Sequence, residues 1–176
     1  MLFTHDTTAS LLAAVELVNT AVEPDTMTDP AQLDAFYARH RYTGSRTHDT
    51  GELDAVRALR APLRRLLTSD RDTAVELVNE TLAAYRAVPR LVRHDGLDYH
   101  IHVVHPDTPF ADRIAAETAM AMIDVIRADE MSRLSVCADE TCDGIVLDLS
   151  RNRSRRYCST TCGNRLAVAA YRARKR

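Results

Sequence analysis

Four cysteines near the end of this 176-residue chain restrict its fold more than any other feature. They form two close pairs: four residues lie between Cys137 and Cys142, three between Cys158 and Cys162, and fifteen between the pairs. A segment of this size with one short hairpin and one helix buries too little apolar surface to fold alone. Four thiolates around a zinc ion supply on the order of 10 kcal/mol of folding free energy.

We therefore predict one structural zinc ion per chain, held by Cys137, Cys142, Cys158 and Cys162. Zinc prefers a tetrahedron of sulfur ligands and needs no redox change. A redox-active pair and an iron–sulfur cluster stay open as alternatives, since both also use closely spaced cysteines. The first pair is expected in a turn before a strand, and the second pair at the start of the final helix.

The net charge of −2 conceals a strong asymmetry along the chain. Residues 1–136 carry 14 basic and 21 acidic side chains, residues 137–150 carry four acids and no base, and residues 151–176 carry nine bases and no acid. A block of one sign contacts nucleic acid or an acidic partner, or forms a solvated tail. Arginine suits phosphates and guanine edges, which favours nucleic acid.

The candidate nucleic-acid contacts are Arg151, Arg153, Arg155, Arg156, Arg165, Arg172, Arg174, Lys175 and Arg176. Four thiolates around zinc leave a local charge of −2, so one or two of these side chains can serve to neutralise the metal site. Arg165 follows Cys162 closely, and both a base-edge contact and a contact with the zinc thiolates stay open for it.

Apolar residues at helical spacing predict helices over about 8–22, 30–40, 51–68, 71–88 and 108–131. Asp95-Gly96 predicts a hairpin, with Leu97, Tyr99, Ile101 and Val103 on one face of its second strand. Residues 144–150 read as a strand paired with residues 155–158, and a helix is expected from residue 160. The predicted fold class is α+β: a mostly helical domain with a small antiparallel sheet over residues 1–134, then a zinc module over residues 135–176.

No constellation in residues 1–134 indicates catalysis. His100 and His102 share a strand face at a spacing that some metal sites use, but ordinary histidines on a polar face are the simpler interpretation. The sequence shows no phosphate-binding glycine loop and no nucleophile elbow. Because no catalytic constellation is visible, we expect that the protein is not an enzyme. The sequence also shows no membrane span and no secretory signal, so we expect it in the cytoplasm.

The end of the chain resembles the CGNR zinc-finger family, named for the tetrapeptide that here is Cys162-Gly163-Asn164-Arg165. Upstream, ELVNT (residues 16–20) and DTPFADRIAAETAMAM resemble the start and the last helix of the ABATE domain that precedes this finger. The resemblance implies a treble-clef module with the four cysteines as ligands. Its basic signature matches Arg151, Asn152, Ser154, Arg155, Arg156, Gly163, Asn164 and Arg165.

Two positions depart from that family's pattern. Tyr157 stands where many members have tryptophan, and Ala167 stands where many have a lysine that would add a phosphate contact. The resemblance implies a zinc-dependent, DNA-binding transcription regulator of bacteria, induced by stress or responsive to a ligand. The expected partners are double-stranded DNA, a small-molecule effector of the first domain and a second copy of the chain. An RNA- or protein-binding role in a larger assembly stays open.

Overall fold

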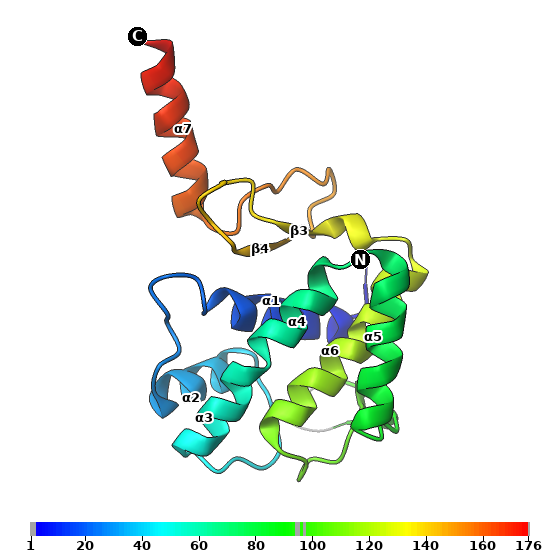
Figure 1. Cartoon of the computed structure of the whole chain (residues 1–176). Helices are drawn as coiled ribbons and strands as arrows, with labels where there is room; N and C mark the ends of the chain where they lie inside the picture. The colour runs from blue at the N-terminus through cyan, green and yellow to red at the C-terminus, as the bar shows by residue number, and fades with distance from the viewer. Residues whose placement is uncertain (1–2, 94–95, 97, 176) are drawn as a thin grey trace.

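The computed structural model describes residues 3–93, 96 and 98–175. A helical body carries a smaller module at one end, and the last helix projects away from both (Figure 1). The helices are α1 (His5–Asn19), α2 (Pro30–Arg39), α3 (Thr50–Ala58), α4 (Arg60–Thr68), α5 (Arg71–Ala84), α6 (Phe110–Arg127) and α7 (Thr160–Arg174). The strands are β1 (Arg90–Val92), β2 (His100–His102), β3 (Leu134–Val136) and β4 (Ile145–Leu147). The predicted α+β class is confirmed.

Helix α6 forms the centre of the helical body, packed between α1 and α5. Most of its girth is apolar, and Ile114 and Met122 are fully buried in the main core. Leu11 and Leu17 of α1 are buried against the same core. The sequence had predicted this central place for α6, because a helix with apolar side chains all around must be enclosed by its neighbours.

The single helix expected over residues 51–68 is wrong, because the structure breaks it at Leu59 into α3 and α4. Pro62 has no N–H and so cannot donate to Ala58, which makes this the natural place for a new helix to begin. The break also turns Arg60 inward. Its guanidinium donates to both carboxylate oxygens of Asp25, at 2.8 and 3.1 Å.

The predicted hairpin is present as an antiparallel pair in which Arg90 faces His102 and Val92 faces His100. Residues 94, 95 and 97, where the turn and Leu97 were expected, lie outside the described residues. The expected apolar face is only partly buried: Val103 packs in a small core, whereas Tyr99 is 65% exposed and Ile101 38% exposed. A two-stranded ribbon has too little surface to bury a whole face by itself.

Strand β4 pairs with β3 and not with residues 155–158, which corrects the second predicted hairpin. The backbone of residues 155–158 has other partners: the Arg155 N–H donates to the Asp148 carboxylate, and the Cys158 N–H points to the Cys137 sulfur. The expected domain limit at residues 134 and 135 falls inside β3.

The β3–β4 hairpin is joined to the helical body through shared core and through one side chain of α1. Leu134, Ile145 and Leu147 belong to the main hydrophobic core. Asn19 donates from its amide nitrogen to the Ile145 carbonyl at 2.8 Å and accepts the Ile145 N–H at 2.6 Å. A single amide thus satisfies both backbone groups of one β4 residue, as a neighbouring strand would.

We predict that Asn19→Ala lowers the free energy of unfolding by about 1–3 kcal/mol, because a buried backbone N–H and carbonyl lose their partners. Urea denaturation of the zinc-loaded protein measures the change. Asn79→Ala, on the exposed face of α5, is the control and should change stability little. Equal stability of the two variants would show that the amide does not hold β4 to α1.

Candidate metal centre and nucleic-acid interface

The four cysteines come from two places in the module and meet at one point. Cys137 and Cys142 lie in the loop between β3 and β4, Cys158 precedes α7, and Cys162 lies in the first turn of α7. All four sulfur atoms lie within 4.8 Å of one another, with separations of 3.5 Å for Cys142–Cys158 and 3.7 Å for Cys158–Cys162. Four sulfurs about 2.3 Å from a zinc ion stand roughly 3.8 Å apart in a tetrahedron. The cluster therefore has the size that zinc requires.

Backbone N–H groups surround the sulfurs and fix the geometry of the loop. The Gly144 N–H points to the Cys142 sulfur at 3.4 Å, and the Cys158 N–H to the Cys137 sulfur at 3.5 Å. The hydroxyl of Ser159, the N-cap of α7, accepts the Cys162 N–H. No acidic side chain occupies the first turn of α7. The positive end of the helix dipole therefore acts on a thiolate instead.

The thiols differ in how easily they ionise. A hydrogen bond between the Ser159 side chain and the Cys162 thiol, together with neighbouring Cys142 and Arg165, lowers the pKa of Cys162 to about 7 despite its burial. Burial raises the pKa of Cys142 and of Cys158 above the ordinary thiol value, and the neighbouring thiols add to the rise for Cys158. Four thiolates at this spacing, three of them buried, repel one another, so a divalent cation at their centre is the physical condition for their ionisation.

Gly144 is a required part of this site that sequence analysis missed. A Cβ on this residue would lie 2.7 Å from the Cys158 sulfur and 3.3 Å from the Cys142 sulfur. Both distances are shorter than an ordinary van der Waals contact, and at the nearer one the Cys158 sulfur would have to shift. The pattern Cys-Asp-Gly in the sequence carries the signal, since a glycine beside a metal ligand often marks close approach.

Arg165 belongs to the metal centre in this structure. Its guanidinium lies 3.3 Å from the Cys162 sulfur, forms an ion pair with Asp139 at 2.9 Å and donates to the Thr141 hydroxyl. Proximity to Cys162 and Asp139 raises the pKa of Arg165 further above its ordinary value. Of the two roles that the sequence left open, this geometry agrees with the contact to the thiolates.

The other basic residues divide into two groups. Arg153 pairs with Glu130 at 2.8 Å, and Arg155 donates to the backbone carbonyls of Tyr157 and Cys158. Five exposed residues form no ion pair within the part of the chain that the structure describes: Arg151, Arg156, Arg172, Arg174 and Lys175. Lys175 packs its ammonium over the Tyr171 ring, and Arg176 lies outside the described residues.

Asp148 shapes the loop that carries the first of these arginines. Its buried carboxylate accepts the N–H of Ser150 at 2.8 Å and that of Arg155 at 2.7 Å, which closes the loop between them. Burial opposes ionisation of Asp148, but these hydrogen bonds outweigh it and hold the pKa below the ordinary value. The loop is thus anchored at its base while Arg151 and Arg156 stay exposed.

The histidine strand has no comparable ligand set. His100 and His102 lie side by side with their Nε2 atoms 3.1 Å apart. Among the described residues, the four cysteines are the one group of three or more histidine, cysteine or carboxylate ligands within reach of a single ion. Nor does any helix in the described ranges combine the length and apolar character that a membrane crossing demands.

Comparison with known families agrees with this geometry. Residues 12–129 match the ABATE family, described as "Putative stress-induced transcription regulator". The chain belongs to this family. Residues 133–175 match the CGNR zinc finger, so the two parts stand in the order that the sequence motifs indicated. A search of curated proteins finds no match. With this family and four sulfurs at tetrahedral spacing, the module is the site of one structural zinc ion. The treble-clef assignment stays a prediction.

We predict that Gly144→Ala weakens zinc binding at least about tenfold, because the added carbon displaces the Cys158 sulfur. Competition with a chromophoric chelator measures the affinity. Gly163→Ala is the matched control in the same module, since its added carbon would meet only the Tyr157 ring. If both variants bind zinc like the unmodified chain, the close packing around Gly144 does not constrain the site.

We also predict that the protein as purified contains one equivalent of zinc, and that Cys162→Ser loses order in α7 and the loop before it. From sequence alone, the whole of residues 135–176 would be expected to unfold. The structure narrows this expectation, because β3 and β4 are held by the main core and by Asn19. Hydrogen exchange with elemental analysis tests both points. Iron in place of zinc, or protected amides throughout α7 in the variant, would contradict them.

Proposed function

We propose that the chain is a transcription regulator whose zinc module binds duplex DNA. The observation that carries the proposal is the set of five unpaired basic residues on a metal-held frame: Arg151, Arg156, Arg172, Arg174 and Lys175. Arg151 lies in the loop between Ser150 and Arg155 that Asp148 closes, and Arg156 directly follows this loop. The other three lie at the end of α7. Exposed cations without an ion pair among the described residues are available to phosphates, and the counterions released on contact drive binding.

The shape of the module supports a nucleic-acid role. Helix α7 is anchored at its zinc end and extends away from the rest of the chain (Figure 1). Its 15 residues span roughly 22 Å, and an α-helix fits the major groove of B-DNA. The zinc ion fixes one end of α7, so the last two turns of the helix can contact a duplex while the rest of the module keeps its conformation.

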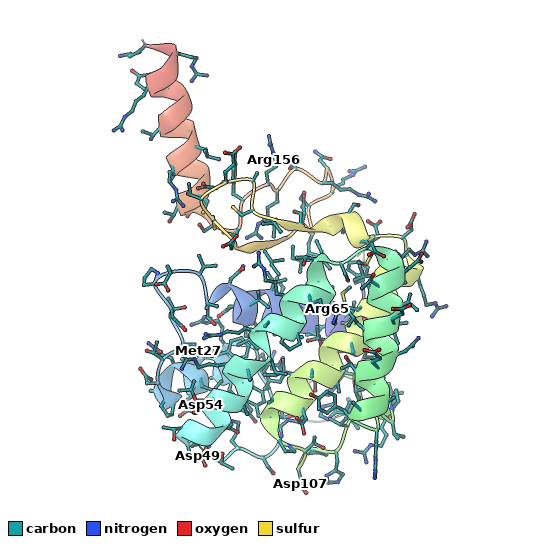
Figure 2. All side chains as sticks on the ribbon, viewed as in Figure 1. Met27, Asp49, Asp54, Arg65, Asp107 and Arg156 are labelled. Carbon is teal, nitrogen blue, oxygen red and sulfur yellow. The ribbon has the colours of Figure 1, made fainter. Side chains whose placement is uncertain are left out.

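The distribution of charge favours one direction of approach. Arg156 lies on the side of the module that faces away from the helical body, whereas Asp49, Asp54 and Asp107 lie at the opposite end of the molecule (Figure 2). Residues 1–136 carry seven more acidic than basic side chains. Phosphates are repelled by the body and attracted by the module, so the field orients the protein before contact.

A protein partner on α7 is the second candidate. Val168 is 48% and Tyr171 52% exposed on this projecting helix. Exposed apolar side chains on a projecting helix are typical of a contact with another chain. A second copy of this protein would place two basic modules side by side, as dimeric DNA-binding proteins do. Contact with DNA and self-association through α7 are therefore compatible.

We predict that affinity for duplex DNA falls with salt, with a slope of log affinity against log salt of about −4 to −5 for five phosphate contacts. Arg172→Ala should weaken binding to all sequences alike and reduce the slope by about one unit. Fluorescence anisotropy with labelled duplexes at several salt concentrations measures both quantities.

Two controls separate this role from general charge effects. Arg65→Ala removes an exposed arginine from α4, on the helical body, and should leave the slope unchanged (Figure 2). Arg165→Ala should lower the zinc content of the protein, because the Arg165 guanidinium contacts Cys162 and Asp139. Any change of slope in this variant is therefore read together with its zinc content. A slope near zero contradicts the proposal, and tighter binding to a structured RNA of equal length would assign the module to RNA instead.

A further inference from the structure

A cavity of about 860 Å³ lies where the helical body meets the zinc module. One face of α1, residues 39–43 and β2 form most of its wall, and Glu117 of α6 lies among them. The cavity continues to β4 and reaches Arg155 and Cys158. This volume is typical of sites that enclose a small organic ligand. None of the described contacts of the zinc centre requires such a space.

Two polar groups at this wall have no partner in the described chain. The Tyr42 hydroxyl is buried and forms no hydrogen bond. The Glu117 carboxylate forms neither a hydrogen bond nor an ion pair with any described residue. Native proteins leave few buried polar groups unsatisfied, and each such group calls for an explanation. A buried hydroxyl without a partner, beside a half-buried carboxylate without a partner among the described residues, indicates a ligand that supplies hydrogen-bond donors.

Burial raises the pKa of Glu117 to about 7, and nearby Asp6 adds to the rise. Arg113 opposes it, but the guanidinium of Arg113 is directed elsewhere. Its Nη1 donates to the backbone carbonyls of Ser45, Pro106 and Thr108 at 2.7–2.9 Å. Burial raises the pKa of Tyr42, and the negative charge of Glu117 raises it further. Glu117 therefore has no hydrogen-bonded cation among the described residues, and the effect of burial on its pKa dominates.

The two carboxylates that α1 contributes to the wall already have partners. Glu16 accepts from Arg39 and contacts His40, with an Oε2–Nε2 distance of 3.0 Å. Asp6 accepts the Ile101 N–H at 3.0 Å. Of the acids that α1 and α6 place in this wall, Glu117 is therefore the one without a partner among the described residues, and the Tyr42 hydroxyl lies in the same wall.

The rest of the wall is suited to an apolar ligand body. Ala9, Leu12, Ala13 and Val15 of α1 line the cavity opposite Ile101 of β2. Leu12 is 42% exposed, which is large for an aliphatic side chain in the middle of a packed helix. An occupant with an alkyl or aromatic body would cover it and gain the corresponding hydrophobic free energy.

We propose that this cavity binds a small organic amine with an apolar body. Its ammonium group donates to the Glu117 carboxylate and the Tyr42 hydroxyl, and its body packs against α1. The same wall includes Ile145, Leu147 and Cys158, so a bound ligand also contacts the zinc module. We expect the ligand to change the affinity for DNA by this contact, and that expectation rests on the function proposed above.

Isothermal titration of the full zinc-loaded chain with octylamine tests the proposal, with 1-octanol as the neutral probe of equal length. We expect octylamine to bind at least about tenfold more tightly than octanol, the difference that a buried charge-assisted hydrogen bond makes. Glu117→Gln should remove this preference, and Tyr42→Phe should reduce it. Glu76→Gln, on the exposed face of α5 and away from the cavity, should leave it unchanged.

Equal affinities for octylamine and octanol would overturn the proposal, as would an unchanged preference in Glu117→Gln. Tighter binding of octanoate than of octylamine would do the same. Thermal melting of each variant shows that it is folded, and Tyr42→Phe provides an independent test that retains every charge. The titration contains no DNA, so its failure and a failure of the DNA-binding proposal are separate results.

Discussion

The mutual repulsion of four closely spaced thiolates, relieved by one zinc ion, is the constraint on which the module depends. Without the cation, burial raises the pKa of Cys142 and Cys158 and favours the neutral thiols. With it, the β3–β4 loop, the segment before α7 and the first turn of α7 are tied to one point. The rest of α7 makes few contacts with the body (Figure 1). Its orientation is therefore set at the metal.

The β3–β4 hairpin transmits this constraint to the helical body. On one side its loop supplies Cys137 and Cys142, and on the other Ile145 and Leu147 pack in the main core. Asn19 completes the connection with hydrogen bonds to the backbone of Ile145. The hairpin lies within the residues that match the CGNR zinc finger, yet it packs in the main core, which is built mostly by the residues that match the ABATE family. Any change in the body that moves α1 also acts on the frame that carries the arginines.

Local patterns in the sequence predicted the elements whose cause is local. The helix expected over residues 30–40 and the cysteine pairs are examples, because each depends on residues a few positions apart; the structure begins α2 at Pro30, with a capping box of Asp29 and Gln32. The break at Leu59 was missed, because the apolar stripe continues through it and indicates a single helix. Pro62 was the one residue in this segment that indicates a break. Asn19 and Gly144 were missed for another reason: their roles depend on Ile145 and Cys158, which only the folded chain brings near.

The arginines illustrate why composition alone overstates an interface. A zinc ion with four thiolates carries a charge of −2, and Arg165 is placed to offset part of it while also pairing with Asp139. Arg153 forms an ion pair with Glu130, and Arg155 donates hydrogen bonds to backbone carbonyls. These three side chains stabilise the module. The cations without an ion pair among the described residues are Arg151 and Arg156, in and beside the loop that Asp148 closes, and Arg172, Arg174 and Lys175 at the end of α7. On the function proposed above, these are the side chains that remain for contact with phosphates.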